Sequence, residues 1–210
     1  MADYKTTSLV EWQQTANGKR LMTFEQAHLK KFISNHYADR LLQISGKPLI
    51  ERKDVYHYVL LEEHMESQMA AVPTVKANIN LKLPFRSESF HTIVSCHAHE
   101  RVSSLPAFLE EVERILLPEG SLIIYGISFT SIWAIALMFK MHYVPFCQRL
   151  YSDFEVKKQL NKLDLRFHTM GSSELLLSLR QKYTLDLAHQ AHYVLIAKKT
   201  VSGMMLNVSF

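Results

Sequence analysis

The sequence predicts an α/β protein with a three-layer, doubly wound and mostly parallel β-sheet that ends in a C-terminal antiparallel hairpin. Strand patterns alternate with helix patterns through the middle of the chain, which is typical of parallel sheets with right-handed crossovers. The last two strand patterns have no clear helix between them, so we expect them to pair antiparallel at one edge. The length of 210 residues suits one domain with a full core.

The first elements follow from hydrophobic spacing and turn residues. Residues 22–38 have apolar positions at roughly helical spacing, and Thr23 stands where an N-cap is expected. Residues 40–44 form a short apolar run that ends in the Ser-Gly-Lys-Pro turn at 45–48, which predicts the first strand. Residues 55–61, VYHYVLL, are β-branched and aromatic and predict the second strand.

The second half of the chain has stronger patterns. Residues 89–96 predict a strand with a buried centre. Residues 105–116 predict the clearest helix, with Pro106 in its first turn and an apolar face, and Pro118-Glu119-Gly120 is expected to stop it. A helix is expected to begin at Ser152 or Asp153 as N-cap, with Phe154, Leu160 and Leu163 inward. The other expected elements are a helix at 132–141 and strands at 121–127, 165–170 and 192–197.

Composition and charge argue against several classes of protein. The net charge is +4, but Lys and Arg are scattered, so no strong nucleic-acid surface is expected. Cys96 and Cys147 suggest no disulfide framework, which favours a cytoplasmic location. Residues 122–139 lack charge, but Gly126 and Ser128 interrupt them, so a buried strand and helix are expected rather than a membrane span. Superficial contact with a membrane surface stays open.

A series of short motifs lies between residues 77 and 126. In chain order they are Leu83-Pro84-Phe85, Ser89-Phe90-His91, His97 with Glu100, Arg114-Ile115-Leu116 and Pro118-Glu119-Gly120. This order resembles the class I S-adenosylmethionine-dependent methyltransferases, particularly their type 11 branch. The resemblance implies one methyltransferase-like domain over residues 1–210. It would have a helical extension at 1–38, an α/β core at 39–200 and a tail at 201–210.

The resemblance implies S-adenosylmethionine (SAM) as the cofactor. In the family three features hold this cofactor. They are a glycine-rich turn after the first strand, an acid that ends the second strand and a polar residue after the third strand. The implied cofactor-binding residues here are Gln43, Ser45 and Gly46, then Glu62 and Glu63, then Asn78 and Ile79, with Cys96 and His97 lining the pocket at the end of a central strand. Only Gly46 remains of the expected glycines, and Gln43 stands near the place of the family's acid.

The run Cys96-His97-Ala98-His99-Glu100 also contains metal-ligand residue types. On a strand His97 and His99 would share a face and Cys96 would point away, and no third ligand is evident nearby, so no metal site is predicted. His97 or His99 is a candidate general base, although many methyl transfers need only alignment of the reactants. An acceptor pocket is a further hypothesis for the aromatic residues Phe129, Trp133, Phe139 and Tyr143.

These observations leave two main functions. The first is a SAM-dependent methyltransferase that acts on an unidentified small-molecule or protein acceptor. The second, which the eroded turn favours, is a catalytically inactive methyltransferase-fold protein that serves as a scaffold for a protein partner or as a regulatory binding module. A basic nucleic-acid or membrane-surface binder on the same fold is a third alternative.

Overall fold

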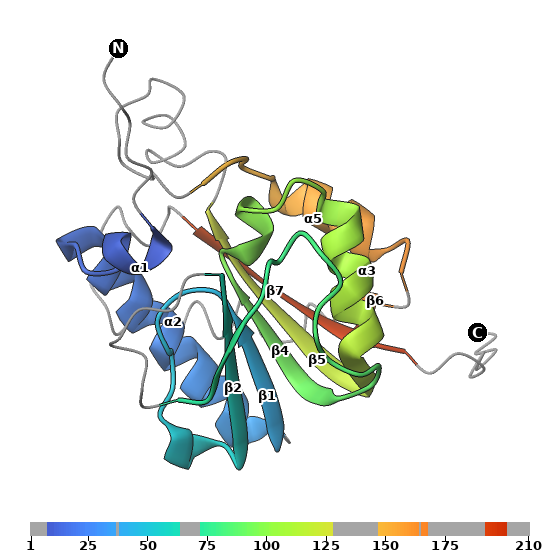
Figure 1. Ribbon diagram of the computed structural model, residues 1–210, viewed down its shortest axis with the longest axis horizontal. Coiled ribbons are helices and arrows are strands. Elements are labelled where there is room, and N and C mark those ends of the chain that lie inside the picture. The colour runs from blue at the N-terminus through green and yellow to red at the C-terminus, as the bar shows by residue number, and fades with distance from the viewer. Residues whose placement is uncertain are drawn as a thin grey trace, which may run out of the picture.

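A seven-stranded, mostly parallel sheet forms the centre of the protein (Figure 1). The computed structural model describes residues 8–36, 38–63, 72–127, 147–163, 165–167 and 192–200. Its strands are β1 (Arg40–Ile44), β2 (His57–Glu62), β3 (Thr74–Lys76), β4 (Phe90–Cys96), β5 (Leu116–Ile127), β6 (Leu165–Phe167) and β7 (His192–Lys199).

The strand order is β3-β2-β1-β4-β5-β7-β6. The first five strands run parallel, whereas β7 pairs antiparallel with both β5 and β6. The order reverses between β1 and β4, and such a switch point is where α/β sheets bind ligands, beyond the carboxyl ends of the strands. The predicted doubly wound sheet with a C-terminal antiparallel pair is confirmed.

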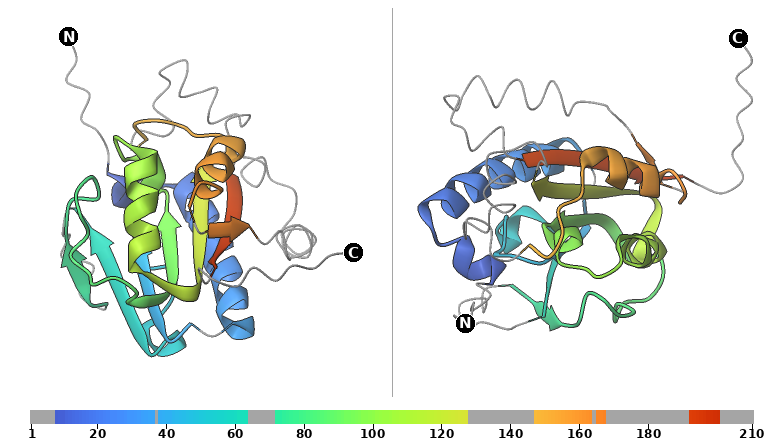
Figure 2. Two further views of the ribbon diagram at one scale, coloured as in Figure 1. Left: turned by 90° about the vertical axis from the view of Figure 1, so that its right-hand side faces the viewer. Right: turned by 90° about the horizontal axis from the view of Figure 1, so that it is seen from above.

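Helices cover both faces of the sheet (Figure 2). One face carries α2 (Ala16–Asn35), which the short α1 (Leu9–Trp12) precedes. The other face carries α3 (Leu105–Ile115) and α5 (Asp153–Leu160). Two short 3₁₀ turns, η1 (Arg52–Asp54) and η3 (Ala98–Glu100), lie in the connections. The described residues contain no helix long and apolar enough to cross a bilayer.

Two hydrophobic clusters fill the layers on either side of the sheet. In β1, Leu41 packs with the α2 side chains, while its neighbour Leu42 packs with those of α3. In β4, Ile93 and Val94 divide between the two faces in the same way. Successive strand residues point to opposite faces, and both faces are buried. This is why the strands read as continuous apolar runs rather than as alternating ones.

The start of α2 differs from the prediction. The helix begins at Ala16, and its N-cap is Thr15, whose side chain accepts a hydrogen bond from the Gly18 amide. Thr23 lies inside the helix and donates to the Lys19 carbonyl at 2.8 Å, so the prediction that it caps the helix is wrong. The first turn is largely polar and exposed, and it therefore adds no apolar periodicity that would reveal it.

Two features of the sheet were also not foreseen. β3 has only three residues, too few to give a hydrophobic pattern. β5 begins at Leu116, directly after α3, so Pro118-Glu119-Gly120 lies within the strand instead of ending the helix. The pairing register between β4 and β5 shifts between Phe90 and Thr92, and Glu119 has a left-handed backbone (φ 62°), as in a bulged strand.

The buried face of α5 also differs from the prediction. The helix is capped by Ser152 in a capping box with Glu155. Val156 and Leu160, four residues apart, are fully buried, whereas Phe154 is 71% exposed. The inward placement of Leu160 is confirmed, and that of Phe154 is wrong because Phe154 lies on the other side of the helix. The expected helix at 132–141, the end of the strand at 165–170 and the four aromatic acceptor candidates lie outside the described residues.

The orientation of α5 can be tested with two substitutions in one helix. Leu160→Ala should lower the free energy of unfolding by about 2–5 kcal/mol, because it leaves a cavity in the core. Phe154→Ala should change it by no more than about 0.5 kcal/mol, because the ring lies in solvent. Urea denaturation followed by circular dichroism measures both, and losses of similar size would contradict this placement of the helix.

Candidate functional site

Most of the residues predicted to bind a cofactor gather at the carboxyl ends of β1, β2 and β4. The turn after β1 carries Ser45 and Gly46, both with left-handed backbone (φ 74° and 81°). A Cβ added at Gly46 would lie 3.0 Å from Gln13 Nε2 and 3.1 Å from Cys96 Sγ. Position 46 therefore needs glycine both for its backbone conformation and for the closeness of its neighbours.

Gln43 supports this turn from inside the protein. It is fully buried, and its Nε2 donates to the carbonyls of Ser45 at 3.0 Å and Lys47 at 2.7 Å. Its Oε1 accepts from the Leu49 amide at 3.0 Å and from the Tyr58 hydroxyl at 2.5 Å. Both donors and both acceptor positions of the amide are thus used within the protein. The structure places Gln43 as a brace for the turn, where the sequence had suggested a cofactor contact.

The acid at the end of β2, Glu62, faces the turn. The carboxylate is buried, and its Oε1 accepts from the Gly46 amide at 2.5 Å and from the Ser45 hydroxyl at 3.2 Å. Its Oε2 accepts from the Glu63 amide at 3.1 Å. Burial raises the pKa of Glu62, although the Arg101 charge and these hydrogen bonds oppose the rise. The two main elements of the predicted cofactor site are therefore in direct contact.

Arg101, which the sequence analysis did not identify, connects three parts of the site. Its guanidinium lies 3.8 Å from Glu62 Oε2, donates to Glu63 Oε2 at 3.0 Å and donates to the Ser45 hydroxyl. Glu63 in turn accepts from the Ile79 amide at 3.3 Å. Arg101 follows η3, so it reaches β1 and β2 only through the fold. Its acidic partners are distant in sequence, so no local sequence pattern points to it.

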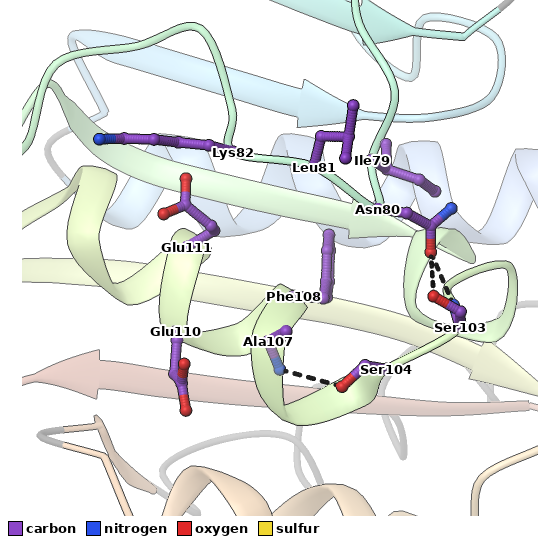
Figure 3. Close-up of a pocket in the computed structure, with 10 residues that line it drawn as sticks. All are labelled: Ile79, Asn80, Leu81, Lys82, Ser103, Ser104, Ala107, Phe108, Glu110 and Glu111. Atoms are coloured by element: carbon purple, nitrogen blue, oxygen red, sulfur yellow. Dashed lines mark hydrogen bonds between the residues drawn. The ribbon is translucent and has the colours of Figure 1, made fainter.

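The loop after β3 holds Asn78 and Ile79. Asn78 is exposed, and its side chain accepts from the amide of Asn80 at 2.8 Å. The Ile79 side chain is buried and lines a cavity of about 260 Å³ at the start of α3. Figure 3 shows this cavity, where the side-chain oxygen of Asn80 accepts two hydrogen bonds from Ser103. The structure thus joins Ile79 to the site through its backbone and leaves the Asn78 side chain outside.

The Arg-x-Leu and Leu-Pro-Phe motifs fix this loop from the other side. Arg114 on α3 donates to the carbonyls of Phe85 at 3.0 Å and Leu83 at 3.2 Å. Glu111, one turn earlier, accepts from the Leu83 amide at 2.9 Å and pairs with Arg114 at 2.8 Å. These motifs position the backbone that leads into β4.

Beyond β4 the chain leaves the strand conformation at once. His97 is left-handed (φ 57°), and η3 follows it. His97 Nε2 lies 2.9 Å from Glu25 Oε1, and Nδ1 lies 3.1 Å from Glu100 Oε2. Cys96 Sγ donates to Glu25 Oε2 at 3.8 Å. The expectation that Cys96 points away while His97 and His99 share a face is wrong, because the left-handed residue turns His97 onto the side of Cys96. His99 instead meets the Tyr193 hydroxyl at 2.8 Å.

His97 is held as an imidazolium between two carboxylates. All three side chains are 1% exposed or less. Burial alone would lower the pKa of His97, but the Glu100 and Glu25 carboxylates outweigh it and raise the pKa to about 10. With both ring nitrogens donating to carboxylates, His97 has no lone pair to accept a proton. This arrangement removes His97 as a general base at neutral pH.

Glu25 was missed by the sequence analysis. It lies on the buried side of α2 together with Leu21, Phe24, His28 and Leu29. A carboxylate on an apolar helix face is a recognisable signal, because such a group needs a partner inside the protein. Glu25, Cys96 and His97 each offer a ligand atom, and these atoms lie within 4.8 Å of one another.

A second buried histidine, His28, lies one turn further along α2. Its Nδ1 is 2.8 Å from the Tyr125 hydroxyl, and its ring packs edge-on against the Tyr125 ring. Burial lowers the pKa of His28 to about 4, and the Lys31 charge adds to the effect. His28 is therefore neutral in the folded protein at pH values where an unfolded histidine is largely protonated.

Comparison with known proteins agrees with this architecture. Residues 53–124 match the model of a methyltransferase domain. No protein in the curated set matches the chain. Among solved structures, the YcgJ protein from Bacillus subtilis is similar with 14% identity and a TM-score of 0.57, over 83% of this chain and 99% of that one. A SAM-dependent methyltransferase from Thermotoga maritima has 15% identity and a TM-score of 0.59, over 86% and 92%. Another from Aquifex aeolicus has 14% identity and a TM-score of 0.58, over 92% of this chain and 100% of that one.

The fold and the family match define a class of protein. The fold with its seven-stranded sheet is similar to those of the solved structures, with TM-scores of 0.57 and 0.59. The fold is that of class I SAM-dependent methyltransferases, and residues 53–124 match a methyltransferase domain. The resemblance seen in the sequence motifs is thereby confirmed.

The neutral state of His28 predicts a loss of stability in acid. The folded pKa is about 4 and the unfolded pKa about 6.5, so the group's contribution is complete above pH 6.5 and is lost as the pH falls towards 4. Over that window the loss should reach about 3 kcal/mol. In His28→Gln, the free energy of unfolding should depend less steeply on pH between 4 and 6.5. The difference should correspond to about one proton fewer released on folding. The exposed His36→Gln serves as control, and equal slopes for wild type and His28→Gln would contradict the assignment.

Proposed function

We propose that the chain is a SAM-dependent methyltransferase that transfers a methyl group to a small-molecule or protein acceptor. The observation that carries this proposal is the contact between Glu62 Oε1 and the Gly46 amide at 2.5 Å. It brings the acid at the end of β2 to the turn after β1, at the switch point of the sheet. A ribose diol bound to that carboxylate would have the glycine backbone beside it.

The residues at this edge have distinct roles in the proposal. Glu62 accepts hydrogen bonds from the ribose hydroxyls, and Gly46 lets the backbone approach the nucleoside. Glu63 and the backbone of Ile79 flank the adenine, next to the cavity that the Ile79 side chain lines. Ser45 completes the turn, and the exposed Asn78 lies at the outer edge of the proposed cofactor site.

Cys96 lies behind the turn, on the side of the methionine part. SAM supplies an electrophilic methyl group, which moves to the acceptor while S-adenosylhomocysteine is released. The chain's contribution is to hold and align the two reactants, which alone accounts for a large share of rate enhancement in such transfers.

Arg101 competes with a cofactor in this arrangement. Its guanidinium lies against Glu62, Glu63 and Ser45, which are the groups that the nucleoside needs. Binding therefore requires Arg101 to leave Glu62, and its ion pair with Glu63 is the contact it would keep. Removing the guanidinium should strengthen cofactor binding, whereas removing the Glu62 charge should weaken it.

A second candidate, a catalytically inactive methyltransferase-fold protein, is favoured by the contacts of Gln13. The Gln13 Oε1 accepts from the Lys47 amide at 2.6 Å, and its Nε2 lies 3.8 Å from Cys96 Sγ. Gln13, Gln43 and Glu62 together use hydrogen-bonding groups of the turn that a cofactor would otherwise meet. In this alternative the sheet is a scaffold for a protein partner or a regulatory ligand, and the turn is a purely structural element.

Calorimetric titration with SAM and S-adenosylhomocysteine tests the proposal. Wild type should bind with micromolar affinity. Glu62→Gln should weaken binding about ten- to a hundredfold, the effect of losing hydrogen bonds to a charged group. Arg101→Gln should tighten binding by up to about tenfold, because it removes the competitor for Glu62. The exposed Glu110→Gln is the control for loss of a carboxylate.

The two candidates give different results in this experiment. If neither wild type nor Arg101→Gln binds either ligand at millimolar concentration, the methyltransferase proposal is overturned and the inactive alternative stands. Binding that Glu62→Gln leaves unchanged would also overturn it, because the ribose would then lie elsewhere.

A further inference from the structure

The Glu25–Cys96–His97 cluster lies behind the Gly46 turn, away from the residues assigned to the ribose and adenine. It combines three elements that are distant in sequence, since Glu25 comes from α2, Cys96 ends β4 and His97 is the left-handed residue that follows. All three side chains are 1% exposed or less. The proposed methyl transfer uses none of their charges, so the cluster needs an account of its own.

The spacing of the donor atoms suits a small divalent cation. A tetrahedral zinc ion bound by sulfur, nitrogen and oxygen holds its ligand atoms about 3.3–3.6 Å apart. The Cys96 Sγ lies 3.8 Å from Glu25 Oε2, and His97 Nε2 lies 2.9 Å from Glu25 Oε1. All three ligand atoms lie within 4.8 Å of one another. Shifts of a few tenths of an ångström to about one ångström would bring each of them to bonding distance from one ion.

The second ring nitrogen of His97 has the partner that metal-binding histidines have. His97 Nδ1 lies 3.1 Å from Glu100 Oε2, while Glu100 Oε1 accepts from the Ile127 amide. A carboxylate on the far nitrogen fixes the ring so that Nε2 presents its lone pair to a metal. Glu100 is itself anchored to β5, and the ring orientation is therefore set before any ion arrives.

The charge of the cluster also suits such an ion. The Cys96 thiol donates to Glu25 Oε2 and His97 Nε2 donates to Glu25 Oε1, so each of these two ligand atoms carries a proton that a cation can displace. A divalent ion would replace two protons, one from the Cys96 thiol and one from His97 Nε2, and both would pass to solvent. The total charge would stay the same, which avoids the cost of burying an extra charge.

We propose that Glu25, Cys96 and His97 bind a divalent cation of the zinc class, with Glu100 as the positioning residue for His97. Sulfur, imidazole and carboxylate donors together favour zinc or cobalt over magnesium or calcium, which prefer oxygen alone. Three protein ligands leave a fourth position. Gln13, whose Nε2 is 3.8 Å from Cys96 Sγ, is a further polar side chain next to the cluster.

Cobalt substitution of the full-length protein tests the thiolate ligand directly. Wild type loaded with Co²⁺ should show the intense visible bands of a tetrahedral ion and a near-ultraviolet charge-transfer band from sulfur to cobalt. Cys96→Ala should lose the charge-transfer band, and Cys147→Ala, the matched control for the second cysteine, should keep it. Zinc measured by mass spectrometry after dialysis should be close to one ion per chain in wild type and Cys147→Ala.

Glu100→Gln tests the positioning role without removing a ligand. The Ile127 amide needs an oxygen acceptor, so the glutamine nitrogen should face His97 Nδ1 and force the ring proton onto Nε2. Zinc affinity should then fall about 10- to 100-fold. Glu110→Gln, the same substitution on the exposed face of α3, should leave zinc affinity unchanged.

The proposal is overturned if wild type retains no zinc and binds Co²⁺ without a sulfur charge-transfer band. This result needs no variant, so it holds even if a substitution prevents folding. Equal zinc content in folded Cys96→Ala and wild type would overturn it as well. The readouts involve no SAM, and the outcome is therefore independent of the proposed methyl transfer.

Discussion

The site depends on one buried charge, the His97 imidazolium between Glu25 and Glu100. The two contacts, at 2.9 and 3.1 Å, join α2, the end of β4 and η3, and the second oxygen of Glu100 extends the connection to the Ile127 amide in β5. Burying an ion pair is costly, but removing one partner costs about 3–5 kcal/mol because it leaves the other charge without compensation. The fold around this point therefore has to keep all three groups together.

This constraint explains the form of the turn after β1. Glu25 holds Cys96 at the inner side of the turn, and Gly46 has room for no side chain because Cys96 Sγ and Gln13 lie so close. With no side chain in the way, the Gly46 amide reaches Glu62 Oε1. The turn, which usually carries several glycines in methyltransferases of this fold, thus keeps one here, at the residue whose amide donates to Glu62.

The sequence predicts the fold better than the site, for a physical reason. β1, β4 and α3 are visible because their burial repeats along the chain, and the switch point follows from the order of elements. Glu62 and Gly46 are also visible, because strand ends are local features. Arg101 is not, since its partner Glu63 is 38 residues away in sequence. Glu25 is visible only as a carboxylate on an apolar helix face, a pattern that does not identify its partner His97, 72 residues away. The left-handed conformation of His97 has no periodic signature either, and it alone reverses the predicted facing of Cys96 and His97.

The two sides of the Gly46 turn are coupled through a single backbone segment. On the inner side the Lys47 amide donates to Gln13, and Cys96 lies next to the place where a Gly46 side chain would begin. On the outer side the Gly46 amide donates to Glu62, which also lies near Arg101. An ion held by Cys96 would fix the inner wall of the turn, whereas release of Arg101 would free its outer carboxylate. In the proposed function, Gln13 and Cys96 thus shape the nucleoside-binding edge from behind the turn, without contact to the nucleoside.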